Sequence, residues 1–203
     1  MSPAEYVELE RRSGQKHEYV AGRLYAMAGA SRKHNLVCGN LIRALGERLR
    51  GRRCAVMPSD QQVFVEATKL ATYPDVTVLC GPAKGHEDFP QSLVNPLILV
   101  EVLSASTEAY DRGAKFDHYR RIETLREYLL VSTDRIAVDH YLRDGDGTWR
   151  LTAYRGIGAQ LLLPSVDSAV SLSEIYENID LVAPEGLEEP LPYRTPVDFT
   201  RPS

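Results

Sequence analysis

Residues 97–104 read LILVEVLS, and this stretch decides the fold. Six of its eight residues are Leu, Ile or Val, a composition typical of a strand buried on both faces in the middle of a sheet. One acid, Glu101, interrupts the apolar run. A buried carboxylate costs on the order of several kcal/mol unless it is paired or bound to a cation. Glu101 is therefore a candidate functional residue.

A second acid, Asp75, lies at the start of the preceding predicted strand, in YPDVTVLCG at 73–81. Neighbouring strands can place two carboxylates side by side, where they repel each other unless a metal ion neutralises them. Ligand sets made only of oxygen favour Mg²⁺ or Mn²⁺, and these ions act on phosphates. Taken singly, each acid has another interpretation. Asp75 could cap the strand, and Glu101 could form a salt bridge with a buried Arg or Lys.

The flanking sequence predicts an α/β (α+β) protein. A hairpin is expected over 17–28, and Ser31 is placed to cap a helix with an apolar stripe that ends at Gly51. The further expected elements are a strand within 54–66, a surface loop at 81–96, a helix over 111–123 with Ala114, Tyr119 and Ile122 inward, three strands within 127–154 and a short helix near 179. We expect one domain over 1–182 and an acidic, Pro-rich arm over 183–203.

Composition indicates a globular protein of the cytoplasm. The 203 residues contain no apolar run of the roughly 18 residues that a membrane span needs, and the N-terminus does not resemble a signal peptide. Cys38, Cys54 and Cys80 are odd in number and widely spaced. This pattern predicts free thiols in a reducing compartment, and it argues against disulfides or a zinc site.

Charge is unevenly distributed along the chain. The net charge of −4 gives no support to nucleic-acid binding, but residues 31–53 carry seven Lys or Arg and one acid, Glu47. Such a segment could contact a phosphate backbone, or it could simply be a solvated helix face.

Lys115 lies on the predicted helix that follows the Glu101 strand, so its side chain could reach back toward the end of that strand. A cation there could orient an attacking water or neutralise charge that develops on a phosphate. The alternative is an ordinary surface lysine.

Five motifs along the chain resemble one protein family. HEYVAGRLYAMAGAS, YPDVTVL, LILVEVLSAST, YDRGAKFDHYRR and EYLLVS resemble the Uma-type restriction endonucleases, once catalogued as a domain of unknown function, within the PD-(D/E)XK nuclease superfamily. The similarity covers about residues 3–177. It implies a restriction-endonuclease-like fold, a mixed central sheet flanked by helices.

The resemblance also implies roles for particular residues. Asp75 matches the first metal-binding acid, Glu101 matches the second, and the Val102 carbonyl is a further expected metal ligand. Leu103 stands where the superfamily pattern has its lysine. In this family Lys115 takes that place from the following helix, provided that its ammonium group reaches the same point in space.

Other residues have a weaker claim to the site. Glu18 resembles the family's N-terminal acid and could bind a second ion or position water, although a salt bridge within the hairpin is an alternative. His34 and Asn35 could contact phosphate from the helix N-terminus, with capping or core packing as the alternative. Supporting or capping roles are expected for Asp60, Ser104 and Asp111.

The activity implied by the resemblance is Mg²⁺-dependent hydrolysis of phosphodiester bonds, with Mn²⁺ as a substitute. DNA is the expected substrate, a homodimer the expected assembly, and no membrane is involved. A catalytically silent module that binds nucleic acid or protein on the same fold is the alternative, since the net charge is acidic and Leu103 is not lysine. A structural homo-oligomer is a third possibility.

Overall fold

The computed structural model describes residues 1–27 and 29–181, so the expected arm at 183–203 lies outside the described residues. The helices are α1 (Pro3–Arg12), α2 (Arg32–Arg48), α3 (Glu108–Tyr110), α4 (Phe116–Tyr119) and α5 (Leu172–Ile175), with a π-helix at Asp111–Lys115 and a 3₁₀ turn at Pro164–Val166. The strands are β1 (His17–Val20), β2 (Arg23–Ala26), β3 (Cys54–Pro58), β4 (Val63–Val65), β5 (Leu70–Thr72), β6 (Val76–Cys80), β7 (Ile98–Leu103), β8 (Glu127–Ser132), β9 (Ala137–Arg143), β10 (Trp149–Arg155), β11 (Gln160–Leu163) and β12 (Ser168–Ser171).

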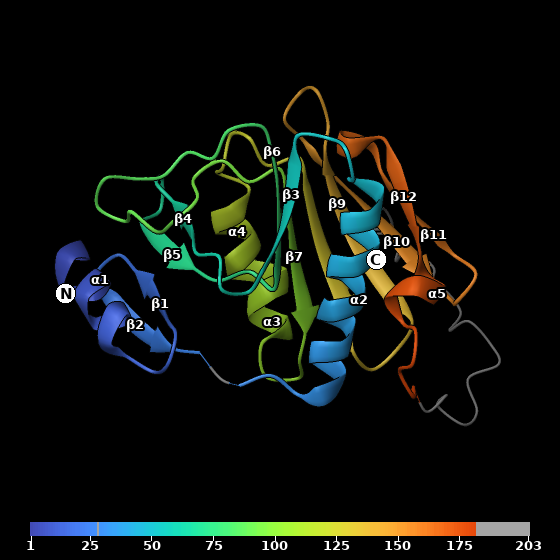
Figure 1. Ribbon diagram of the computed structural model, residues 1–203, viewed down its shortest axis with the longest axis horizontal. Helices are drawn as coiled ribbons and strands as arrows, with labels where there is room; N and C mark the ends of the chain where they lie inside the picture. Colours follow the sequence, from blue (N-terminus) through green and yellow to red (C-terminus); the bar gives the residue numbers. More distant parts are fainter. Residues whose placement is uncertain (28, 182–203) are drawn as a thin grey trace, which may run out of the picture.

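A six-stranded mixed sheet in the order β10-β9-β8-β7-β6-β3 forms the centre of the protein. Within it β7 and β8 are parallel, whereas the other neighbours are antiparallel. Helix α2 lies along one face, while α3 and α4 lie on the other face, between the large sheet and the smaller sheet β2-β1-β5-β4 (Figure 1). This is the mixed sheet flanked by helices that the sequence predicted.

Strand β7 is buried at every position, as its sequence predicts. Because side chains alternate across a strand, Ile98, Val100 and Val102 join the core beneath α2. Leu99 and Leu103 join the opposite core. Glu101 alternates with Val100 and Val102, so its carboxylate points to the same face of the sheet as Leu99 and Leu103, toward α4.

Helix α2 begins and packs as its sequence indicates. The Ser31 hydroxyl accepts a hydrogen bond from the His34 backbone N–H, which satisfies one of the unpaired donors of the first turn. The expected apolar stripe is buried at Val37, Leu41, Ala44 and Leu45. The cap therefore fixes where α2 begins, and with it the position of His34 in the first turn.

Three arginines of the basic segment at 31–53 bind groups within the protein itself. Arg43 pairs with Glu177, and Arg48 donates to Glu174 at 2.6 Å. Arg52 donates to the Val166 carbonyl. These arginines therefore bind the C-terminal part of the described chain, two of them through its acidic side chains.

Several short elements were not predicted from the sequence, and one predicted strand is divided. The expected strand at 54–66 is two strands, β3 in the large sheet and β4 in the small one, because a turn closed by Gln61 N–H and the Pro58 carbonyl at 3.0 Å separates them. The missed elements are α1, β5, β11 and β12. Apart from α1, they are too short for hydrophobic periodicity to reveal.

The expected helix at 111–123 is shorter and includes the π-helix at 111–115. Tyr119 and Ile122 are buried as predicted, but Ala114 is exposed and Lys115 is buried in its place. A π-helical turn contains more residues than an α-helical turn, so it shifts which side chains face inward. The prediction that Ala114 faces the core is therefore wrong.

The prediction of three free thiols is also wrong. Cys54 and Cys80 are directly opposed in the antiparallel pair of β3 and β6, with Cα atoms 4.0 Å apart, and they form a disulfide. Cys38 is free. The cysteines therefore no longer support the expected cytoplasmic location. Among the helices of residues 1–27 and 29–181, none combines the length and the apolar character needed to cross a bilayer.

Candidate active site

Asp75 and Glu101 lie next to each other on adjacent strands, with Asp75 just before β6 and Glu101 within β7, as the sequence predicted. Strands β6 and β7 are antiparallel with Val76 opposite Val100, and this register places Asp75 beside Glu101. The backbone N–H of Val102 donates to Asp75 Oδ2 at 2.7 Å. The two acids are thus connected through the backbone of β7.

Lys115 reaches this pair from the π-helix. Its Nζ lies 3.0 Å from Glu101 Oε1, 3.3 Å from Asp111 Oδ1 and 3.4 Å from Glu18 Oε1. The residue is only 5 % exposed, so the interpretation as a surface lysine is wrong. A lysine on the following helix therefore lies beside the acids although Leu103 occupies the expected position.

Glu18 is brought to the same cluster from β1. It accepts a hydrogen bond from the Thr72 hydroxyl, and its Oε2 accepts one from the Tyr110 hydroxyl at 3.2 Å. Its ionic partner among the described residues is Lys115, so the interpretation as a salt bridge within the hairpin is wrong. The smaller sheet thereby contributes one acid to a site built mainly on the larger sheet.

Two tyrosines complete the cluster, and sequence reasoning missed their polar contacts. The hydroxyl of Tyr119 donates to Glu101 Oε1 at 2.7 Å, and that of Tyr128 donates to the Asp111 carbonyl at 3.0 Å. Tyr119 was expected only as a core residue. Its position four residues after Lys115 on a helix was the available signal, since such residues share a face.

Burial and crowding of acids shift the ionisation of these groups. Burial, with further contributions from Asp75 and Asp111, raises the pKa of Glu101 to about 8 although Lys115 opposes the shift. Burial likewise raises the pKa of Asp111. Burial disfavours the charged form of Lys115, but the three surrounding carboxylates outweigh it and raise its pKa. Three carboxyl groups therefore share one lysine, and the raised pKa values of two of them reflect this crowding together with burial.

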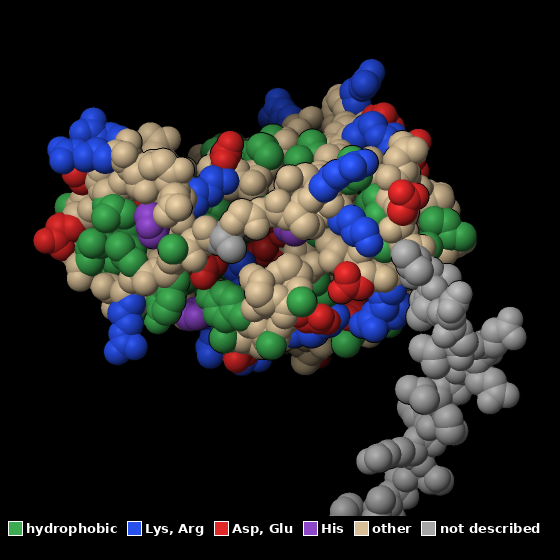
Figure 2. All heavy atoms as spheres, turned by 90° about the horizontal axis from the view of Figure 1, so that it is seen from below, with side chains coloured by type: hydrophobic (Ala, Val, Ile, Leu, Met, Phe, Trp, Pro, Cys, Tyr) green, Lys and Arg blue, Asp and Glu red, His purple; other side chains and the backbone are tan. Residues whose placement is uncertain are grey.

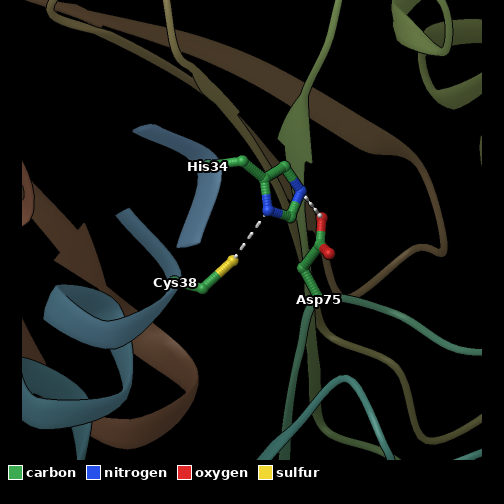
Figure 3. A group of neighbouring side chains, drawn as sticks. All are labelled: His34, Cys38 and Asp75. Atoms are coloured by element: carbon green, nitrogen blue, oxygen red, sulfur yellow. Dashed lines mark hydrogen bonds and ion pairs between the residues drawn. The ribbon is translucent and has the colours of Figure 1, made fainter. Parts of the chain in front are cut away.

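His34 contacts the exposed side of this cluster. Its Nε2 lies 3.2 Å from Asp75 Oδ2, and its Nδ1 lies 3.5 Å from the Cys38 Sγ (Figure 3). Burial alone would lower the pKa of the imidazole, but hydrogen bonding and attraction to Asp75 raise it overall. His34 thus belongs to the site through Asp75.

Three other candidates lie outside the hydrogen-bonded cluster. Asn35 is exposed at the start of α2. Asp60 is exposed and pairs with Lys16. Ser104 contacts the hydroxyls of Ser106 and Thr107 after β7, and its side chain does not cap α3.

The donors present suit a hard divalent ion. Among the described residues, Asp75 accepts hydrogen bonds through Oδ2 and Glu101 through Oε1, which leaves Asp75 Oδ1 and Glu101 Oε2 available to an ion. Carboxylate oxygens that retain free lone pairs, in an acidic cluster, are the donors that Mg²⁺ and Mn²⁺ prefer. Figure 2 shows a hollow near the middle of one face, where acidic, basic and histidine side chains lie together. The residues therefore fit a divalent metal.

Comparison with known proteins identifies the family. Residues 3–173 match the Uma2 family, described as "Putative restriction endonuclease". Two Synechocystis sp. proteins are similar: slr1290 is 37% identical over 88% of this chain and 93% of its own, and sll1609 is 34% identical over 79% and 91%. A solved structure titled "a putative nuclease belonging to DUF820", from Anabaena variabilis, shares the fold, with a TM-score of 0.67 and 14% identity over 84% of this chain and 97% of that one. The chain belongs to the Uma2 family of restriction-endonuclease-like proteins.

Proposed function

We propose that this protein is a divalent-metal-dependent endonuclease that hydrolyses phosphodiester bonds of DNA. One observation carries the proposal. Asp75 and Glu101 lie side by side on adjacent strands, and a buried lysine lies 3.0 Å from Glu101. Family membership supports a nuclease-like function, while the metal and the DNA substrate are our extension of it.

Asp75, Glu101 and the Val102 carbonyl would hold Mg²⁺, with Mn²⁺ as a substitute. When bound, such an ion polarises a phosphate oxygen and lowers the pKa of a coordinated water. The backbone hydrogen bond from Val102 to Asp75 holds the first carboxylate in place. The hydroxyl of Tyr119 and the ammonium of Lys115 hold the second through its Oε1, which leaves Oε2 free to bind.

Lys115 has a second role in this proposal. Its ammonium group is a fixed cation beside the acids, and it can stabilise negative charge that develops on the scissile phosphate. The surrounding carboxylates outweigh burial and raise its pKa, which favours the charged ammonium form. Glu18, held by Thr72 and Tyr110, positions the ammonium from the opposite side. In-line attack by water would leave a 5′-phosphate and a 3′-hydroxyl.

The second candidate function is a silent nuclease-like module that binds nucleic acid or protein. The net charge of −4 favours it, because an acidic protein has no overall attraction to DNA, whereas the leucine at position 103 is offset by Lys115. Homodimerisation is compatible with either function, since two copies could each cut one strand. Metal-dependent turnover therefore has to separate the two.

The test is cleavage of supercoiled plasmid DNA with Mg²⁺, Mn²⁺ or EDTA. Wild-type protein should nick or linearise the plasmid only with metal, and Asp75→Ala should abolish cutting while circular dichroism and the melting temperature remain close to wild type. Asp60→Ala, at an exposed acid that pairs with Lys16 and not with the cluster, is the matched control and should cut normally. DNA retention without metal and without cutting would instead support the silent module.

A further inference from the structure

We infer that His34 is a nitrogen ligand of the same divalent ion, so that the site prefers Mn²⁺ and similar transition metals over Mg²⁺. This inference rests on the proposed metal site and specifies its chemistry. The sequence indicated a ligand set made only of oxygen. The structure adds an imidazole beside the first carboxylate, from an element that is remote in the chain.

The spacing of the two donor atoms fits a shared ion. His34 Nε2 and Asp75 Oδ2 are 3.2 Å apart. Two ligands bound at about 2.1 Å and at right angles to each other lie about 3 Å apart. The side chains of His34 and Asp75 are 14% and 16% exposed, so both lie at the edge of the buried cluster, where an ion can enter. One donor atom each from His34, Cys38 and Asp75 lies within 4.8 Å of the others.

The imidazole is held in this orientation from its other side. Cys38 follows His34 by four residues on α2, and its Sγ lies 3.5 Å from Nδ1, the nitrogen that points away from Asp75 (Figure 3). Metal-binding histidines generally use their second nitrogen for such a contact, which fixes the ring and its tautomer. The Ser31 cap fixes the backbone of His34 at the start of the helix.

Cys38 is a positioning residue in this arrangement and not a ligand. Its sulfur contacts Nδ1, whereas the nitrogen directed at Asp75 is Nε2. We therefore expect nitrogen and oxygen around the ion, with sulfur outside its coordination sphere.

A mixed nitrogen and oxygen set changes the order of metal affinities. Imidazole binds Mn²⁺ and later transition metals, whereas Mg²⁺ strongly prefers oxygen. Removal of His34 should therefore weaken Mn²⁺ binding more than Mg²⁺ binding. This difference separates a ligand from a residue that only forms a hydrogen bond to Asp75, whose removal should affect both ions alike.

The experiment is pulsed electron paramagnetic resonance of Mn²⁺ bound to the full chain, combined with calorimetric titration of Mn²⁺ and Mg²⁺. Wild-type protein should show coupling of Mn²⁺ to one ¹⁴N nucleus. His34→Ala should lose this coupling and bind Mn²⁺ about 10- to 100-fold more weakly, a typical range for disrupted metal sites. Its Mg²⁺ affinity should change much less. His86→Ala, at a histidine packed against Phe64, is the control and should keep the coupling.

Several outcomes would overturn the inference. These are wild-type Mn²⁺ without nitrogen coupling, coupling that persists in His34→Ala, and equal losses of Mn²⁺ and Mg²⁺ affinity. Replacement of the ion by Co²⁺ tests the role of Cys38, because a sulfur charge-transfer band lost in Cys38→Ser would make sulfur a ligand. The plasmid assay keeps the two proposals apart. If cutting requires Asp75 but not His34, and Mn²⁺ shows no nitrogen coupling, the ligand inference fails and the nuclease proposal stands. If Mn²⁺ shows nitrogen coupling but the protein does not cut DNA, only the nuclease proposal fails.

Discussion

Two buried acids on neighbouring parallel strands have very different surroundings. Glu101 on β7 is 3% exposed and Glu127 on β8 is 0% exposed. Glu127 lies 2.7 Å from His140 Nε2, and its Oε1 accepts the backbone N–H of Ser165 at 2.8 Å. Glu127 points to the same face of β8 as Leu129 and Val131, which pack beneath α2, so it lies on the opposite side of the sheet from Glu101.

The difference lies in the balance of charge. Glu127 has one basic residue beside it, His140, and accepts one backbone N–H, from Ser165. Glu101 shares Lys115 with two more acids, Glu18 and Asp111, and Asp75 lies beside it. A buried acid alone therefore does not mark a functional site. A surplus of acids around one cation is a better indicator, because an added cation, like a bound proton, lowers the repulsion between them.

The largest effect is expected from Lys115→Met, which removes the cation of the acid-rich cluster. Three buried carboxylates would lose their partner, so unfolding free energy should fall by about 3–5 kcal/mol. Cleavage should fall by about 10²–10³ as well, the range for loss of one charge-stabilising group. Urea denaturation and plasmid cutting measure the two effects. Lys84→Met, at an exposed lysine, is the control, and equal behaviour of the two variants would contradict the assigned role.

We expect the stabilisation of the protein by metal to depend on Glu101 and not on Glu127. Mn²⁺ at about 100 times its dissociation constant should raise the free energy of unfolding by about 2.7 kcal/mol, because the ion binds the folded state. Denaturation with and without the ion should show this shift in wild type and in Glu127→Gln. Glu101→Gln should lose most of it. A full shift in Glu101→Gln would place the metal elsewhere.

The Glu127 pair should matter for stability and not for cutting. Glu127→Gln removes the charge opposite His140 in a fully buried position, and we expect a loss of about 2 kcal/mol of unfolding free energy. Cleavage rate per folded molecule should stay within about twofold of wild type. A large loss of cleavage in a folded variant would mean that the two acids do not differ in the way described.

The last expected effect is a change of stability with pH. The pKa of Glu101 is raised from 4.5 to about 8, chiefly by burial. Between these values the folded state keeps a proton that the unfolded state has lost, so this group makes the metal-free protein less stable as pH rises, by at most roughly 1.4 kcal/mol per pH unit. Denaturation in EDTA should show a shallower decline for Glu101→Gln. Identical slopes for variant and wild type would argue against the raised pKa.

Much of the site could be predicted from sequence because its signals are local. An acid within an apolar strand identified Glu101, and order along the chain placed Asp75 on the neighbouring strand. The resemblance located Lys115 on the helix after β7. The misses were contacts between remote segments, such as Thr72 with Glu18 and the hydroxyl of Tyr119 with Glu101. For Thr72 and Glu18 the sequence carries no periodic signal, and for Tyr119 the only signal was its helical spacing from Lys115.

The sequence by itself determined the buried central strand, the acid within it and the hairpin and capped helix that precede it, because propensity and periodicity act within a few residues. Only the tertiary structure decided that the π-helix turns Lys115 inward and that His34 meets Asp75. It also decided that Cys54 faces Cys80 across two strands. These outcomes depend on strand register and helix phase, which arise when distant segments pack together. The strands of the sheet could be predicted from the sequence, whereas the acids gather around one lysine only when the chain folds.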